Sequence, residues 1–180
     1  MYLTVRAYPV AMTWAAPDVV REPGPWAGGE RELLDWFLDF GRLTLRHKCS
    51  GLTAGQLARR STEPSGLSLL GLVRHMTEVE RGWFRRGFAG QPADPPYCTA
   101  DMPDADFEDA TASSAELDLA TYQREVELVR AAVQGRSLDE TLPTADTSLR
   151  WIYLHMIAEY ARHNGHADLI RERIDGATGQ

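Results

Sequence analysis

Hydrophobic residues recur at the three- and four-residue spacing of an amphipathic helix in four long stretches of the chain. These stretches predict helices over about residues 30–50, 68–88, 114–134 and 147–174. The predicted buried face of the first helix consists of Leu33, Trp36, Phe37, Phe40, Leu43, Thr44 and His47. No stretch keeps the two-residue alternation of a strand for long enough to compete. The pattern therefore predicts an all-α protein.

The links between the predicted helices differ in length. The link after the first helix contains a short helix that Thr53 can cap, and the link after the third is brief. Residues 89–113 instead contain four prolines and an acidic run, which favour a long crossover. Short links favour antiparallel neighbours, and a long crossover lets the second and third helices run parallel. We expect a four-helix bundle in up-down-down-up order.

Proline and glycine residues set the start of the chain apart from the helical part. We expect three segments: an irregular arm over 1–29, a single domain over 30–176 and a tail over 177–180. Arg6 and Pro9 interrupt the apolar start before it reaches the length of a signal-peptide core. Met12 is a second candidate start beside the first residue.

Composition removes several classes of protein from consideration. The chain has 19 Lys and Arg against 26 Asp and Glu, a net charge of -7, and no basic face for nucleic acid. Two cysteines are too few for a disulfide scaffold and fit a reduced cytoplasmic protein. No apolar stretch approaches the roughly 20 residues that a membrane helix needs. We therefore expect a soluble, acidic, cytoplasmic protein.

The predicted fourth helix carries the most specific chemistry. Glu159 and His163 lie one turn apart, within about 20° of the apolar face of that helix. A buried charge without a partner costs several kcal/mol, and a divalent metal suits two side chains that point the same way. His75, on the inner face of the second predicted helix, is the third candidate ligand. Two histidines and one carboxylate leave positions open on a metal, which is typical of catalytic sites.

A structural role is the alternative for the same residues. Glu159 could pair with a histidine or an arginine and merely fix the register of the helices. The candidate arginines are Arg74, Arg81 and Arg162. His155 and His166 lie roughly 60–80° from the apolar centre of the fourth helix. Either could be a fourth ligand, a proton shuttle or a half-exposed surface residue.

Other polar and aromatic residues receive simpler interpretations. His47 is the substitute ligand if one of the three candidates is wrong, and Glu159 is the one carboxylate expected to point inward. The acids of the crossover are expected to be solvated: Asp101, Asp104, Asp106, Glu108 and Asp109. The aromatic residues of the helices are expected in the core: Trp36, Phe37, Phe40, Trp83, Trp151 and Tyr160.

Two segments together carry a family resemblance. Residues 68–84 (SLLGLVRHMTEVERGWF) and 159–172 (EYARHNGHADLIRE) resemble the DinB-like superfamily, and residues 12–178 are covered. The nearest branch comprises actinobacterial proteins related to mycothiol-dependent maleylpyruvate isomerase. The resemblance implies a four-helix bundle that binds a divalent metal through His75, Glu159 and His163. His163 to His166 replaces the His-Arg-Gly-Gln tail common in the superfamily, which leaves the role of His166 open.

The resemblance also implies a reaction. We expect a metal-dependent transferase or isomerase that uses a low-molecular-weight thiol such as mycothiol to attack an electrophilic substrate. Zinc is the first choice of metal, with nickel, iron and manganese as alternatives. His166 or His155 would move protons, and Arg46, Arg74 or Arg81 would meet substrate carboxylates. The alternatives are a metal-dependent hydrolase on the same site and a non-catalytic ligand-binding bundle with a structural polar core. A homodimer through a helix face is also expected.

Overall fold

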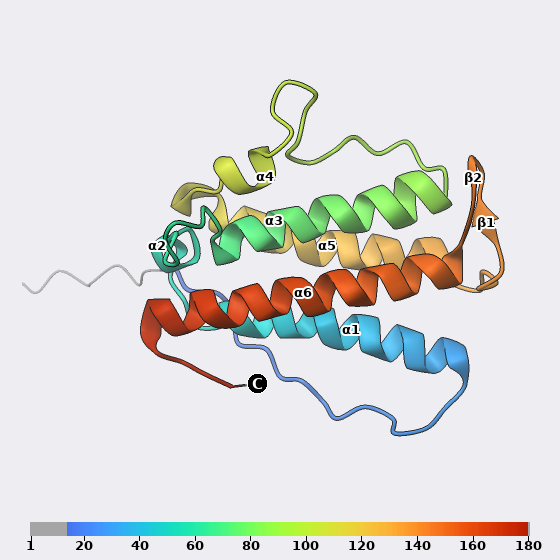
Figure 1. Cartoon of the computed structure of the whole chain (residues 1–180), viewed down its shortest axis with the longest axis horizontal. Helices are drawn as coiled ribbons and strands as arrows, with labels where there is room; N and C mark the ends of the chain where they lie inside the picture. Colours follow the sequence, from blue (N-terminus) through green and yellow to red (C-terminus); the bar gives the residue numbers. More distant parts are fainter. Residues whose placement is uncertain (1–13, 180) are drawn as a thin grey trace, which may run out of the picture.

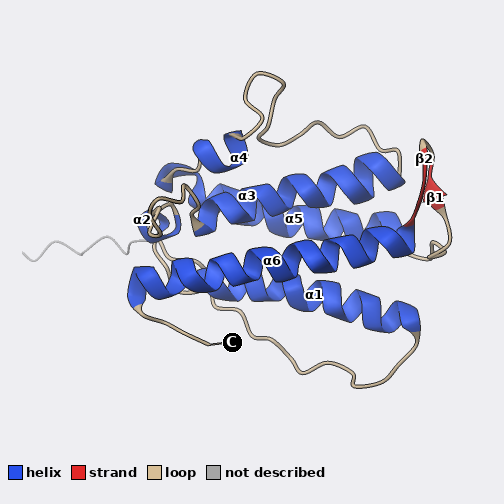
Figure 2. Cartoon of the chain, in the orientation of Figure 1, coloured by secondary structure: helices blue, strands red, loops and turns tan. Residues whose placement is uncertain are grey.

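The computed structural model describes residues 14–179, and helices dominate it (Figures 1 and 2). The four long helices are α1 (Glu30–Cys49), α3 (Leu69–Glu80), α5 (Ala115–Val133) and α6 (Leu149–Asp175). A π-helical segment, Arg81–Phe88, continues α3 directly. The predominantly helical class predicted from the sequence is confirmed. The candidate start at Met12 and the first part of the predicted arm lie outside the described residues.

Short elements complete the fold. They are α2 (Ala54–Leu57), α4 (Ala105–Glu108), a 3-10 turn (Ala112–Ser114) and the antiparallel strands β1 (Thr141–Leu142) and β2 (Ala145–Ser148). The expected cap of α2 is present, because the Thr53 hydroxyl accepts a hydrogen bond from the backbone of Gln56. The two strands do not change the predicted all-α class, because they form only one short hairpin before α6. The two strands span two and four residues, too few for a periodic pattern to reveal.

The four long helices lie side by side (Figure 1). In that view α3 and α5 run in one direction, and α1 and α6 run in the other. Helix α1 packs on α6, and α3 packs on both α5 and α6. Residues 89–113 connect α3 to α5 as a long crossover that contains α4. Among residues 14–179, no helix is long and apolar enough to cross a membrane.

The buried face of α1 differs from the predicted one. Its buried residues are Leu34, Leu38, Arg42, Leu45, Lys48 and Cys49. Phe37 is 52% exposed, and Trp36 and Phe40 are only partly buried. The segment before α1 accounts for this second apolar stripe. Arg21 lies over the Phe40 ring, and His47 Nδ1 lies 3.1 Å from the carbonyl oxygen of Val19.

Buried carboxylates are more numerous than predicted. Glu80, Asp106, Asp118 and Glu125 are all at most 4% exposed. Each has an arginine or histidine partner on another element. The pairs are Glu80 with Arg42, Asp106 with His75, Asp118 with Arg74, and Glu125 with Arg81 and Arg85. The expectation that Glu159 alone points inward was therefore wrong. These pairs stay buried because every charge has a hydrogen-bonded partner.

Candidate metal centre

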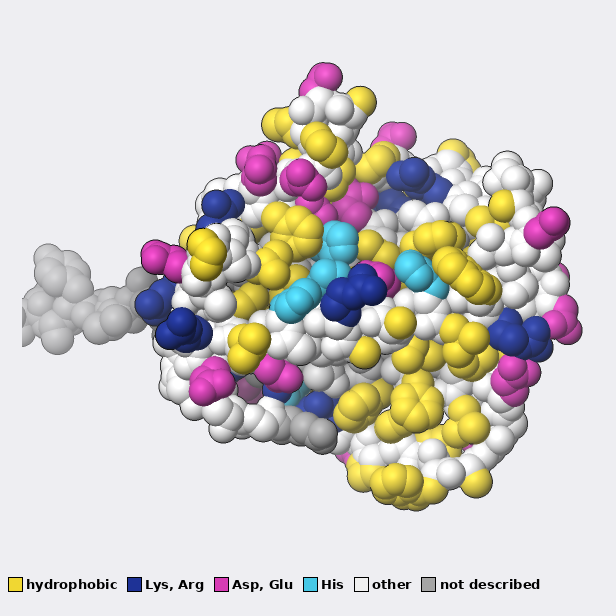
Figure 3. All heavy atoms as spheres, in the orientation of Figure 1, with side chains coloured by type: hydrophobic (Ala, Val, Ile, Leu, Met, Phe, Trp, Pro, Cys, Tyr) yellow, Lys and Arg dark blue, Asp and Glu magenta, His cyan; other side chains and the backbone are white. Residues whose placement is uncertain are grey.

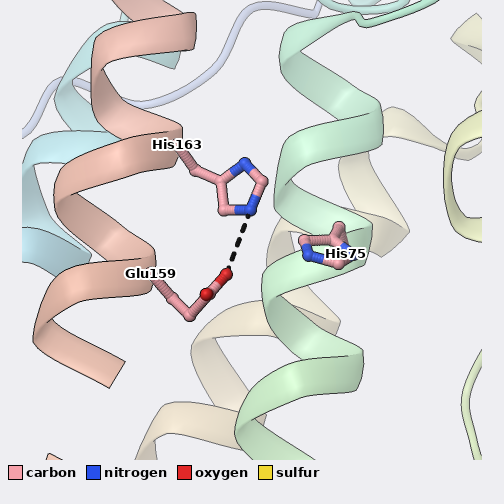
Figure 4. A group of neighbouring side chains, drawn as sticks. All are labelled: His75, Glu159 and His163. Atoms are coloured by element: carbon pink, nitrogen blue, oxygen red, sulfur yellow. Dashed lines mark ion pairs between the residues drawn. The ribbon is translucent and has the colours of Figure 1, made fainter. Parts of the chain in front are cut away.

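Two helices bring the three predicted ligands together. Glu159 and His163 lie one turn apart on α6, and His75 projects from the facing side of α3 (Figure 4). Both helices start at a serine, Ser148 and Ser68, whose hydroxyl accepts a backbone hydrogen bond from the first turn. These caps fix where each helix begins and therefore which face its side chains occupy.

The spacing of the donor atoms fits a metal ion. One ligating atom from each of His75, Glu159 and His163 lies within 4.8 Å of the other two. His163 Nε2 and a Glu159 carboxylate oxygen are 3.4 Å apart. Two donors at about 2.0–2.2 Å from one tetrahedral metal stand about 3.3–3.6 Å apart. The described residues therefore hold a donor set of two imidazoles and one carboxylate that could bind a divalent cation.

His163 is poised in the form that a metal needs. It is 9% exposed, and burial together with the neighbouring His75 lowers its pKa to about 4. The imidazole is therefore neutral at neutral pH, and only a neutral imidazole offers a lone pair to a metal. Its Nδ1 atom is buried without a hydrogen-bond partner among residues 14–179.

His75 has a partner that the sequence did not reveal. Its Nδ1 atom lies 2.8 Å from a carboxylate oxygen of Asp106 on α4. Asp106 is 4% exposed, so its interpretation as a solvated loop acid was wrong. The contact joins residues 31 positions apart across the crossover, and no local pattern signals such a pair.

Glu159 also makes the kind of arginine and histidine contacts expected if it only fixes the register of the helices. One carboxylate oxygen accepts a 2.7 Å hydrogen bond from Arg162, and the other faces His163. The Arg162 side chain is 61% exposed, so this pair is a weak surface ion pair. Arg162 therefore leaves the second oxygen of Glu159 directed toward the cluster.

The other histidines occupy different surroundings. The His166 ring lies 5.4 Å from the His163 ring, beside the cluster, and its Nδ1 atom has no partner among the described residues. His155 stacks on Trp151 at 4.9 Å and meets Trp83 edge-on, and it is not one of the three clustered donors. His47 packs against the segment before α1, so it does not join the cluster. Trp151 itself is 46% exposed rather than in the core.

Two of the three arginines expected to meet substrate form ion pairs within the protein. Arg74 is buried against Asp118 and the crossover, and Arg81 pairs with Glu125. Arg46 lines a pocket between α1 and α5 together with Leu119 and Gln123. Arg74 and Arg81 are therefore already paired with carboxylates of the protein itself, and contact of these arginines with a substrate stays a prediction.

The face formed by α3 and α6 gathers most of this chemistry. Figure 3 shows histidine side chains together on that face, with hydrophobic side chains around them and acidic side chains nearby. His75 keeps 24% of its side chain exposed, and Glu159 keeps 13%. A small molecule approaching this face can therefore reach the cluster.

Comparison with known proteins gives a family match over most of the chain. A family model described as mycothiol-S-transferase matches residues 33–176. The matched range contains all four long helices apart from the first turn of α1, and it includes His75, Glu159 and His163. No curated protein and no solved structure gives a significant match.

Proposed function

The chain belongs to the mycothiol-S-transferase family, and from this premise we propose that it is an enzyme that transfers mycothiol to an electrophilic substrate at a metal centre. The observation that carries the proposal is the convergence of His75, Glu159 and His163 within 4.8 Å. Membership of this family supports mycothiol as the thiol substrate. The three donor atoms support a metal ion at the site.

His75, Glu159 and His163 would hold the metal. When bound, a divalent cation would supply positive charge that lowers the pKa of a thiol brought to the site, which favours thiolate at neutral pH. In the transfer, the thiol loses its proton and its sulfur forms a bond to the electrophilic carbon. Where the electrophile carries a leaving group, that group departs with its bonding pair; where the thiol adds across a double bond, the displaced π pair takes up the proton that the thiol lost. The carboxylate of Glu159 would contribute one negative charge that offsets part of the charge of the cation.

We assign proton movement to His166 and a positioning role to His155. His166 lies beside His163 and is partly exposed, so its ring can exchange protons with solvent. His155 lies one turn before Glu159 on α6 but is stacked against two tryptophans. That packing suits contact with an apolar part of the substrate, and the proton transfer expected of His155 from the sequence stays a prediction.

The proposed metal, topology, location and oligomeric state are those expected from the sequence. We propose zinc as the metal, and a DinB-like four-helix bundle in up-down-down-up order over residues 30–176, with 1–29 as an arm and 177–180 as a tail. Cys49 and Cys98 are both free thiols, which supports a cytoplasmic location. Exposed apolar side chains such as Phe37 and Leu154 on helix faces support a homodimer, which light scattering would test.

The test joins metal content to thiol transfer. The purified protein is expected to bind about one zinc ion per chain and to conjugate mycothiol to a generic electrophile such as chlorodinitrobenzene. A chelator should abolish the conjugation, and added zinc should restore it. Reactions without thiol test the hydrolase alternative. A hydrolase would still consume the substrate, with water in place of the thiol.

A pair of variants separates enzyme from structural protein. His163→Ala should lose both zinc and activity, whereas His47→Ala should keep both because His47 lies outside the cluster. If His163→Ala keeps stoichiometric metal and changes only stability, the cluster serves the fold and the proposed function fails.

A further inference from the structure

We propose that Asp106 is a positioning residue of the candidate metal centre, which fixes the ring of His75 so that its Nε2 atom faces the metal. This inference rests on the proposed function, since it concerns the same metal. Asp106 comes from the crossover, not from the two helices that carry the candidate ligands. It is not one of the three clustered donors.

The carboxylate determines which nitrogen of His75 carries hydrogen. Asp106 Oδ2 lies 2.8 Å from His75 Nδ1, and an ionised carboxylate can only accept a hydrogen bond. Nδ1 must therefore donate, which leaves the lone pair on Nε2. A histidine that binds a metal through one nitrogen typically donates the other N–H to a carboxylate in this way.

Asp106 is itself held in a single orientation. Its Oδ1 atom accepts a 3.0 Å hydrogen bond from the backbone N–H of Phe107. Its side chain is 5% exposed, so little water competes for the second oxygen. The oxygen that faces His75 is therefore set by the local backbone of α4.

Two rings hold the imidazole from its sides. The Phe107 ring stacks on His75 with centroids 4.8 Å apart and planes 26° apart. The His163 ring meets His75 edge-on at 4.8 Å. Rotation of the His75 ring would break the hydrogen bond to Asp106 and the stacking together. Asp106 and the neighbouring Phe107 thus act as one clamp.

The clamp is anchored to the helix that carries His75. Arg74, the residue before His75, donates a 2.9 Å hydrogen bond to the carbonyl oxygen of Ala105, the residue before Asp106. A second bond from Arg74 reaches the carbonyl oxygen of Asp109. Two adjacent residues of α3 therefore contact α4. Arg74 binds its backbone, and His75 binds the carboxylate of Asp106.

The experiment measures metal affinity and the tautomer of His75 separately. Zinc affinity is determined by competition with a chromophoric chelator for wild type, Asp106→Ala and Asp106→Asn. Asp106→Ala is expected to bind zinc about 10–100-fold more weakly. Asp106→Asn should lose less, because an amide oxygen still accepts a hydrogen bond from Nδ1. Asp104→Ala, which removes an exposed acid of the same crossover, should bind zinc as wild type does.

Nitrogen-15 NMR of the metal-free protein, at a pH where His75 is neutral, reads the tautomer directly. Wild type should carry hydrogen on Nδ1, and Asp106→Ala should shift His75 toward the form with hydrogen on Nε2. Weaker zinc binding with an unchanged tautomer would overturn the positioning role, as would unchanged affinity. If wild type binds no zinc, the proposed function fails, while the tautomer still decides whether Asp106 orients His75.

Discussion

At the scale of single residues, a buried ion pair lies at the centre of the molecule. Arg42 on α1 donates two 2.7 Å hydrogen bonds to Glu80 on α3. The Tyr160 hydroxyl donates a third bond to Glu80 and lies 2.8 Å from the hydroxyl of Tyr122. Burial and the charge of Glu80 raise the pKa of Tyr160 well above its usual range, so this hydroxyl stays protonated. Four side chains from four helices thus satisfy one another.

Breaking this pair from one side should be costly. Arg42→Met leaves Glu80 buried without its cation, and the free energy of unfolding should fall by about 3–5 kcal/mol. Urea unfolding measures the loss, and Arg124→Met is the control. Arg124 pairs with Glu127 while 67% exposed, so its replacement should change stability by less than about 1 kcal/mol. An equal effect of the two substitutions would show that burial does not govern the pair.

The two cysteines should differ in reactivity. Burial raises the pKa of the Cys49 thiol to about 12 and that of Cys98 to about 11. Only Cys98 is partly exposed, so iodoacetamide should label it slowly at neutral pH and progressively faster as the pH rises toward about 11 and thiolate forms. Cys49 should stay unlabelled until the protein unfolds. Mass spectrometry after timed labelling checks this order, and early labelling of Cys49 would contradict it.

The sequence supplied the three candidate ligands but not their surroundings. Glu159 and His163 could be predicted because a helix fixes the relation between residues four apart. Asp106 and Glu80 could not, because their partners lie 31 and 38 positions away in the chain. Which distant charges meet depends on how the elements pack, and a single sequence does not encode that in any local spacing.

At the scale of elements, one glycine lets two helices approach closely. A Cβ atom added at Gly41 on α1 would stand 2.8 Å from the Cβ atom of Tyr160 on α6. The Asn164 side chain also donates a 3.0 Å hydrogen bond to the carbonyl oxygen of Gly41. This contact brings α1 against the segment of α6 that carries Glu159 and His163.

The same substitution should therefore have opposite effects in two helices. Gly41→Ala should destabilise the protein by about 1–3 kcal/mol, because α1 and α6 would be forced apart. Gly165→Ala should stabilise it by about 0.5–1 kcal/mol, because the site is exposed, helical and free of contacts within 4 Å. Thermal unfolding of both variants checks the sign. Destabilisation by Gly165→Ala would contradict the account.

Element boundaries followed from the sequence better than element faces did. Helix α6 ends at Asp175, and the positive φ of 78° at the next residue, Gly176, is the expected stop signal. The buried face of α1 was misplaced, because Trp36 and Phe40 pack under the preceding segment instead of in the core, and Phe37 is exposed. An apolar stripe shows that a helix face is covered, but it does not show by which element.

At the scale of the whole molecule, the crossover is fastened along one side of α3. Glu78 accepts 2.7 Å hydrogen bonds from the backbone N–H groups of both Tyr97 and Cys98. Further along the helix, Arg81 donates to the carbonyl oxygen of Asp94. Together with the contacts of Arg74 and His75, these bonds tie the crossover to the helix at several successive turns. The long connection is thereby part of the site.

Removing one of these anchors should loosen the crossover without unfolding the helices. Glu78→Ala leaves two backbone N–H groups without their acceptor, so the amides of Tyr97 and Cys98 should exchange with deuterium about tenfold faster. Amides in the middle of α6 should exchange as in wild type. Glu108→Ala, which removes an exposed carboxylate of the same segment, is the matched control and should leave both rates unchanged. If Glu78→Ala also leaves the Tyr97 and Cys98 rates unchanged, these two bonds do not hold the crossover, and other contacts, such as those of Arg74, Arg81 and Asp106, hold it in place.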